Sequence, residues 1–246
     1  MGVASTGVSR AAVETALGTV RDPELDESIT SLDFVASVTV AGGDVTVELR
    51  LPTYFCAPNF AYLMVADAYD AVLTVPGVDR ALVRLIEHFA SEEINAGVAA
   101  GRGFAGSFPG LADDELAELR VTFRRKAHRA GQERCASGLV RAGWTVRELA
   151  AATLGDVPAG PDRDRLRRRR LELELPAGDD APLLVDDAGE PVAELDLPAQ
   201  LRFARTTRIS IDGNAALCRG LLDVRYRRQD AAAADDAAAS DAAVVG

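Results

Sequence analysis

The sequence predicts an α/β protein of the α+β type, in which a small α-β-β-α-β domain precedes a mostly helical extension. Residues 44–51 alternate between apolar and polar side chains, which is typical of a half-buried strand. The Ala-Gly-Gly-Asp sequence before them predicts a hairpin turn from a strand over 34–40. Residues 59–73 then carry apolar side chains at helical spacing, and residues 78–86 read as a third strand.

The domain begins with a helix over residues 11–20. Val13, Leu17 and Val20 recur at the spacing of one helix face. Pro23 ends this helix, because a proline cannot continue the backbone hydrogen bonding and restrains the residue before it.

Composition divides the rest of the chain. Aromatic residues make up only 5% of the chain, and its last part is almost entirely alanine and aspartate, a composition typical of disorder. We predict five segments: a disordered lead (1–9), the α/β domain (10–88), a connector (89–112), a mostly helical accessory domain with a small β element (113–229), and a disordered tail (230–246).

Local patterns refine the extension. Residues 89–112 are rich in Gly and Ala and predict an irregular connection. Thr145 followed by Glu148 is the pattern of a capping box at a helix start. Residues 183–197 predict a small hairpin, and residues 208–212 predict a short strand.

Composition and charge also exclude several classes of protein. A net charge of −11 argues against a general nucleic-acid binder, because phosphate binding rests on Lys and Arg. Three cysteines are too few for a disulfide framework. No apolar run approaches the length of a membrane span, and the first residues lack the pattern of a signal peptide. We therefore expect a cytoplasmic protein that binds neither nucleic acid nor membrane.

Two segments carry a more specific signal. The sequence Asp-Pro-Glu-Leu stands at 22–25, and Leu-Pro-Thr-Tyr-Phe-Cys-Ala-Pro stands at 51–58, where a helix begins. With the strand and hairpin between them, they resemble the SufT/PaaD-like iron–sulfur cluster assembly family, which includes the MIP-type domain of cytosolic iron–sulfur assembly proteins. The resemblance covers roughly a third of the chain. It implies a role in maturing iron–sulfur or related metal centres of client proteins.

Cys56 is the central candidate. At a helix start it meets the positive end of the helix dipole and unpaired amides, which favour the thiolate that binds metal. Asp22 and Glu24 offer carboxylates and Thr53 a hydroxyl for binding a cofactor. The alternatives are a buried structural thiol for Cys56, and helix termination and capping for the two acidic residues. No residue is predicted to be catalytic.

One cysteine cannot hold a cluster, which commonly takes four cysteine ligands. The chain would dimerise, borrow ligands from a partner, or add Cys218, Cys135, His88 or His128. We predict Cys56, Cys218 and His88 as metal ligands for iron or a transient iron–sulfur cluster. A packed thiol is the alternative for Cys218, and a structural role is the stronger expectation for Cys135.

Two further features have ordinary explanations. His128 lies in a run of basic residues, which predicts a solvated basic helix face. Residues 163–170 hold six arginines, which favour either a solvated helix face or the docking of an acidic partner.

The sequence departs from the resembling family at three places. Ser-Leu-Asp stands at 31–33 where the family usually has Asp-Leu-Gly, and Asp26 replaces a usual glycine. The segment before Cys56 is one residue shorter, so that Phe55 directly precedes the cysteine. These changes concern the geometry of the site rather than the fold.

Three functions compete. The first is a metallocentre maturation factor, which uses Cys56 to deliver an iron–sulfur or diiron centre to a client such as a multicomponent diiron monooxygenase. The second is a metal-free, chaperone-like accessory protein that binds an oxygenase component. The third, a thiol-dependent enzyme, is disfavoured because no general base stands near Cys56 in the sequence. The expected partners are a client metalloprotein, the assembly machinery and a second copy of the chain.

Overall fold

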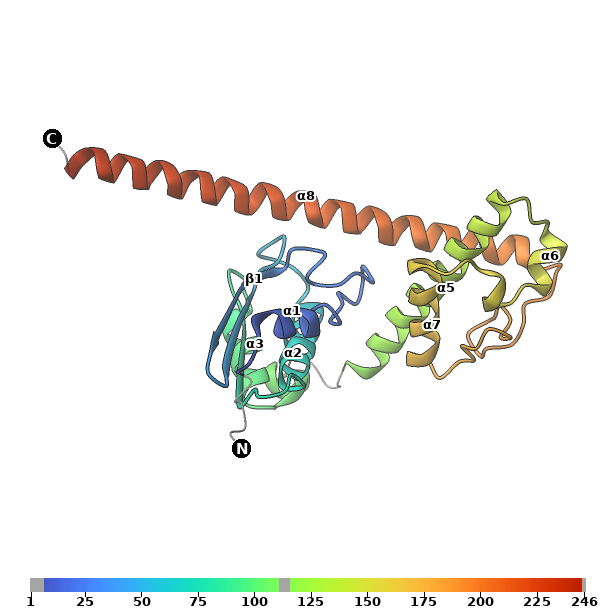
Figure 1. Cartoon of the computed structure of the whole chain (residues 1–246), viewed down its shortest axis with the longest axis horizontal. Coiled ribbons are helices and arrows are strands. Elements are labelled where there is room, and N and C mark those ends of the chain that lie inside the picture. The colour runs from blue at the N-terminus through green and yellow to red at the C-terminus, as the bar shows by residue number, and fades with distance from the viewer. Residues whose placement is uncertain (1–6, 111–115, 245–246) are drawn as a thin grey trace, which may run out of the picture. The chain divides into compact units, whose positions relative to one another are not determined.

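The computed structural model describes residues 7–110 and 116–244 of the chain (Figure 1). The chain forms two compact units, and the first is discontinuous in sequence because the second is inserted into it. The first unit consists of residues 1–23, 27–116 and 214–246, and the second of residues 24–26 and 117–213.

A three-stranded sheet forms the centre of the first unit. Strands β1 (Val35–Ala41) and β2 (Asp44–Leu49) pair antiparallel, and β3 (Arg80–Leu85) pairs parallel to β2, which is the central strand. The alternation along β2 places Val45, Val47 and Leu49 in the core and leaves the polar side chains that alternate with them half-buried. The predicted hairpin and third strand are therefore confirmed.

Helices α1 (Arg10–Leu17) and α2 (Pro58–Leu73) complete the predicted α-β-β-α-β order. Helix α2 contacts β3 and α1, and it buries most of its apolar side chains. With the helical second unit, this arrangement confirms the predicted fold class.

Two short helices, α3 (Ser91–Ala99) and α4 (Gly103–Ser107), occupy the stretch predicted as irregular, so that prediction was wrong. Helix α3 contacts α2 and β3 and buries Ile94 and Val98 among its small residues. The Asn95 side chain accepts a hydrogen bond from the Leu85 amide (2.7 Å) and donates one to the Leu85 carbonyl (3.0 Å), so it extends the backbone pairing at the end of β3.

The second unit is mainly helical. It contains α5 (Ala117–Arg141), α6 (Val146–Ala151), a 3-10 turn (Leu154–Asp156) and α7 (Pro161–Glu172), and α5 contacts α7. The predicted capping box is present, since the Thr145 side chain accepts from the Glu148 amide and the Glu148 side chain accepts from the Thr145 amide. The second unit has an apolar core, which consists of Cys135, Ala136, Leu139, Leu149, Ala152, Leu154, Val157, Leu166, Ala181, Leu183, Leu184 and Leu197.

The small hairpin predicted in the second unit is present as a turn with one bridge. Val185 and Pro191 pair across it, and the Asp186 side chain accepts hydrogen bonds from the amides of Ala188 and Glu190. Gly189 takes a positive φ of 87°, a conformation that glycine adopts without strain.

Helix α8 (Leu197–Val244) begins in the second unit and ends in the first. The short strand predicted over 208–212 was therefore wrong. Arg208 and Asp212 form an ion pair of 3.0 Å one helical turn apart, a contact that a strand would not allow. The disordered tail over 230–246 remains a prediction. Residues 1–6 of the predicted lead and residues 245–246 of that tail lie outside the described residues.

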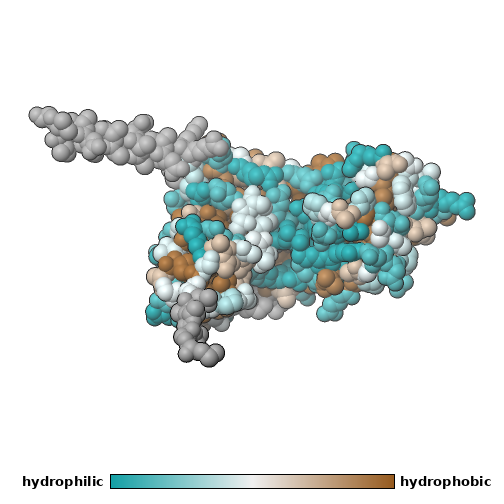
Figure 2. Space-filling view, viewed as in Figure 1, coloured by the Kyte–Doolittle hydropathy of each residue, from teal (hydrophilic) through white to brown (hydrophobic). Residues whose placement is uncertain are grey.

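On the face shown in Figure 2, hydrophilic side chains predominate among the described residues, in keeping with the net charge of −11. No helix within the described ranges combines the length and the apolar character that crossing a membrane requires.

Candidate functional site

Cys56 lies on the loop that joins β2 to α2. It stands two residues before Pro58, the first residue of α2, and its side chain is half-buried. The N-cap residue Ala57 makes no side-chain capping bond, although the Asn59 side chain accepts a hydrogen bond from the Phe60 amide (2.9 Å), and the positive end of the helix dipole lies at this start. The predicted strand-to-helix position of Cys56 is confirmed.

His88 fixes the backbone of Cys56. Its ring is buried, and Nε2 lies 2.7 Å from the Cys56 carbonyl oxygen. The amide of Ala90 donates to Nδ1 (3.2 Å), so Nδ1 is an acceptor and Nε2 carries the proton that it donates to Cys56. Burial, with a further contribution from the charge of Arg225, lowers the pKa of His88 although the Cys56 carbonyl acts in the opposite direction. The imidazole is therefore neutral, and both nitrogens are engaged by backbone groups.

An aromatic patch, formed by Tyr54, Phe55 and Phe89, flanks Cys56. Their exposed fractions are 47%, 78% and 48%, and their ring centroids lie 5.1–6.3 Å apart. The Phe89 amide donates to the Tyr54 carbonyl (3.2 Å), which joins the Cys56 loop to the segment that carries His88. Exposed aromatic side chains in contact with one another are typical of surfaces that bind proteins.

The other predicted residues are distributed over the chain. Asp22 is buried in the first unit, whereas Glu24 is half-buried and belongs to the segment 24–26 of the second unit. Thr53 is half-buried on the Cys56 loop, and Cys218 is half-buried on α8. Their proposed roles toward a cofactor remain predictions.

Residues 26 and 33 take a backbone conformation that favours glycine. Asp26 and Asp33 both adopt positive φ, 54° and 60°, which glycine takes freely and aspartate takes more readily than most residues. Asp26 is buried and ion-paired with Arg169, whose Nε lies 2.7 Å from its carboxylate within the second unit. The Asp26 carboxylate thus makes a structural contact from a backbone position that favours glycine.

Among the described residues, no group of three His, Cys, Asp or Glu side chains is placed to hold a metal ion, and no cysteine forms a disulfide. Cys135 lies in the core of the second unit, as expected, and burial raises the pKa of its thiol to about 12. This thiol is a structural one.

His128, expected on a solvated helix face, is instead buried, and so are Arg169 and Arg170 of the arginine run, whose other arginines are half-buried. His128 is buried beside Arg170, whose Nε donates to its Nε2 (3.3 Å). Arg170 also donates to two backbone carbonyls, and burial lowers its pKa to about 10. Arg169 pairs with Asp26 and Glu172, and Arg167 with Asp179. Much of the arginine run thus stabilises the second unit.

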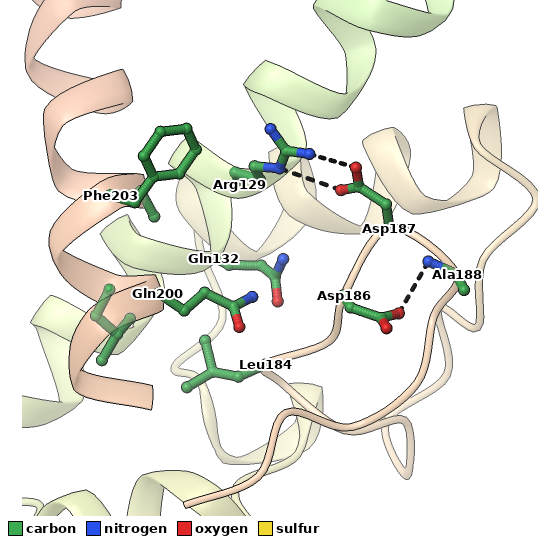
Figure 3. A pocket seen from close by; sticks show the side chains of 10 residues that line it. Arg129, Gln132, Leu184, Asp186, Asp187, Ala188, Gln200 and Phe203 are labelled. Atoms are coloured by element: carbon green, nitrogen blue, oxygen red, sulfur yellow. Dashed lines mark hydrogen bonds and ion pairs between the residues drawn. The ribbon is translucent and has the colours of Figure 1, made fainter. Parts of the chain in front are cut away.

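A cavity of about 650 Å³ opens in the second unit (Figure 3). Arg129 forms an ion pair with Asp187 at the edge of the cavity. The side-chain amides of Gln132 and Gln200 both donate to the backbone carbonyl of Val185, at 3.1 and 3.2 Å. These polar groups hold the turn of the small hairpin against the helices. The cavity is lined by Arg129, Gln132, Leu184, Asp186, Asp187, Ala188, Gln200, Leu201, Phe203 and Ala204.

Known proteins match the first part of the chain. Residues 10–83 match the family model described as iron–sulfur cluster assembly protein. The iron–sulfur cluster carrier protein of Synechocystis sp. is 39% identical over 74 residues, which are 30% of this chain and 20% of that relative. No solved structure is similar at a significant level. The family resemblance of the N-terminal third is thereby confirmed, and the chain spans a fifth of the relative it matches.

Sequence reasoning missed two contributors to the Cys56 loop. It treated His88 only as a metal ligand, and it did not single out Arg225. Arg225 donates to the carbonyl oxygen of Leu51, 174 residues earlier, and no local pattern announces such a contact.

Proposed function

We propose that this protein assists the assembly or delivery of iron–sulfur clusters to a client metalloprotein, and that the Cys56 thiolate contacts the cluster. The family match over residues 10–83 carries this proposal, because Cys56 is the one cysteine within that segment. Its position before the start of α2 supports the role, since a helix N-terminus favours an anion.

The cluster is cargo in this proposal. One cysteine supplies one of the four ligands that a cluster commonly takes, and the described residues offer no group of three ligands. A second copy of the chain or the client supplies the others. Partial ligation suits a carrier, because a cluster that is incompletely held passes readily to a protein that holds it fully.

Transfer is a ligand exchange. Cys56 loses its proton, and its sulfur binds an iron of the incoming cluster. A client thiolate then binds the same iron, the Cys56–iron bond breaks, and Cys56 regains a proton. The iron and sulfide keep their oxidation states, so no external reductant is required.

The remaining candidates enter as supporting groups. We propose Asp22, Glu24 and Thr53 as polar groups that assist binding, and Cys218 as a further ligand. For His88 to ligate a metal, one of its two backbone hydrogen bonds would have to break, so we favour the positioning of Cys56 as its role. The PaaD-like resemblance makes a multicomponent diiron monooxygenase our proposed client.

Anaerobic reconstitution tests the proposal. Wild type, Cys56→Ala, Cys218→Ala and the control Cys135→Ala, which removes the buried structural thiol, are incubated with ferrous iron and sulfide, desalted, and analysed for iron, sulfide and visible absorption. We expect the wild type to bind iron and sulfide and to convert an apo-ferredoxin to its cluster-loaded form. The Cys56→Ala protein should lose both properties, because its only thiol in the matched segment is gone. Retention of both by a folded Cys56→Ala protein would contradict the role of Cys56.

The aromatic patch favours a second candidate, a metal-free accessory protein for an oxygenase component. Its three exposed rings offer a binding surface that needs no metal. Co-expression separates the two functions. The oxygenase component is produced together with wild type or with Cys56→Ala, and the yield of active component and the iron content of each variant are measured. A protein that stays metal-free, and still raises the yield of active component in the Cys56→Ala form, supports the accessory function.

A further inference from the structure

The segment 214–226 of helix α8 belongs to the first unit and presents a regular buried stripe. Ala215, Leu222 and Tyr226 are buried, and they are spaced by seven and four residues, the spacing of one helix face. Cys218 is half-buried and lies on the same face between them. This part of α8 therefore packs within the first unit through a defined side.

Arg225 lies at the end of this stripe and bridges two loops of the Cys56 site. Its Nη1 donates to the Leu51 carbonyl (3.0 Å), and Leu51 begins the segment that leads to Cys56. Its Nη2 donates to the Glu87 carbonyl (2.8 Å), directly before His88, and lies 3.2 Å from the Glu87 carboxylate. One guanidinium thus joins the two loops that the His88–Cys56 hydrogen bond also joins.

Neighbouring contacts hold the same segment in place. The Arg50 guanidinium lies over the Tyr226 ring, 4.6 Å from its centroid, and Arg50 is also ion-paired with Asp33 (2.6 Å). Arg219 is ion-paired with Glu27 (2.6 Å), in the loop that follows the Asp-Pro-Glu sequence. The helix therefore contacts each of the three loops that carry the predicted site residues of the first unit.

We propose that Arg225 is a positioning residue of the Cys56 site, and that residues 214–226 of α8 form a strap that keeps the Cys56 loop and the His88 loop together. This inference rests on the proposed function, because the strap sets the position of Cys56, the thiol that we propose contacts the cluster. A planar guanidinium suits the role, since its fixed fork donates to two carbonyl oxygens at once. A lysine ammonium in its place donates from a single point.

Hydrogen exchange of the full-length protein, read by mass spectrometry, tests the strap. In Arg225→Gln we expect amides of residues 50–57 and 86–90 to exchange at least about tenfold faster, because three charge-assisted hydrogen bonds are lost. Strand β1 should keep its wild-type rate. Arg219→Gln is the matched control, since it breaks an ion pair on the same helix without touching either loop, and its rates over 50–57 should stay within about twofold of wild type.

Arg225→Lys provides the conservative variant and should show intermediate protection in both loops. Arg225→Lys also tests the strap if Arg225→Gln fails to fold. We expect the lysine variant to fold, because lysine keeps the charge and most of the aliphatic stem. Unchanged exchange over 50–57 and 86–90 in a folded Arg225→Gln protein would overturn the proposal. If that protein does not fold, unchanged exchange in Arg225→Lys has the same consequence.

A second readout concerns Cys56 itself. In a Cys218→Ala background, the rate of Cys56 alkylation by iodoacetamide is followed over pH, while Cys135 stays silent because it is buried and its pKa is raised to about 12. The pH–rate profile of Arg225→Gln should differ from that of wild type, and the profile of Arg225→Lys should lie close to wild type. A profile of Arg225→Gln identical to wild type would contradict the proposal that Arg225 positions Cys56. Neither readout involves iron, so the strap and the proposed cluster carriage can fail independently.

Discussion

Among single residues, His128 shows most clearly how burial overrides the character of the neighbouring sequence. It stands in a run of basic residues, yet its ring is buried in the second unit. Burial, followed by the charge of the adjacent Arg170, lowers its pKa to about 4. The folded protein therefore holds a neutral imidazole that accepts a hydrogen bond from Arg170.

This shift predicts a loss of stability in acid. A histidine in the unfolded chain takes up a proton near pH 6.5, whereas folded His128 does so only near pH 4. Between these values the unfolded state binds more protons, so stability is fully present above about pH 6.5 and falls as the pH falls toward 4. We expect His128 to account for about 2 kcal/mol of the stability lost between pH 7 and pH 5.

Urea unfolding of wild type and His128→Gln at the two pH values measures this contribution. The other titrating groups act in both proteins and cancel in the comparison. The variant should lose about 2 kcal/mol less than wild type on acidification, and equal losses in the two proteins would contradict a neutral, buried His128.

Single residues also show where prediction from sequence succeeds. The position of Cys56 followed from local signals, because the alternating strand before it and the proline at the helix start are both encoded nearby. The burial of Arg169 and Arg170 could not be predicted from local signals, because partners of both side chains come from distant segments. Asp26, 143 residues away, pairs with Arg169, and His128, 42 residues away, accepts from Arg170.

Among the elements, the same contrast separates those with strong local patterns from those defined by packing. The capping box at Thr145 and the alternation of β2 were predicted and are present. Helices α3 and α4 were missed, because their many small residues resemble a loop. They form where Ile94 and Val98 become buried and Asn95 binds the end of β3.

The packing of α3 on α4 gives a test at this scale. A Cβ on Gly97 would lie 1.8 Å from Ser107 Oγ, so Gly97→Ala forces the two helices apart. We expect it to destabilise the protein by about 1–3 kcal/mol, as overpacked sites do. Gly220→Ala is the control, since no atom lies within 4 Å of its Cβ position in α8, and it should stabilise by up to about 1 kcal/mol.

Urea unfolding at neutral pH measures both variants. Alanine is the better helix former at either site, so opposite signs would isolate the steric effect of Ser107 on Gly97. If the free energy of unfolding of Gly97→Ala equalled that of wild type, the prediction would be wrong, because α3 and α4 would then separate without loss of stability.

For the whole molecule, the discontinuous first unit is the main departure from what the sequence suggested. Its residues 214–226 come from the far end of the chain, after the whole inserted second unit. The sequence placed these residues in the helical accessory domain. Composition cannot reveal such a return, because the contact between Arg225 and Leu51 joins residues 174 positions apart.

This arrangement predicts that α8 stabilises the sheet of the first unit. Leu222 is 3% exposed and Leu217 is 60% exposed, and both stand on the segment that belongs to that unit. Leu222→Ala should cost about 2–5 kcal/mol, whereas Leu217→Ala should cost little, because only the first removes buried apolar surface. The slowest amides of β1, β2 and β3 should therefore exchange at least about thirtyfold faster in Leu222→Ala.

Native-state hydrogen exchange measures this effect element by element. Amides of α5 and α7 serve as an internal reference, since they belong to the second unit and should keep their wild-type rates. Equal exchange in the two leucine variants over the strands would contradict the contribution of α8 to the first unit.

The contacts of Arg225 also set an order of events during synthesis. Cys56 and His88 leave the ribosome long before Arg225, which lies 138 residues after Glu87. At the usual pace of about 5–20 residues per second, that interval lasts roughly 7–30 seconds. A nascent chain thus displays its thiol loop without the guanidinium that joins it to the next loop. The contacts of Arg225 can form only after this part of α8 has been made, so the synthesis of α8 sets the time at which the Cys56 site reaches its final form.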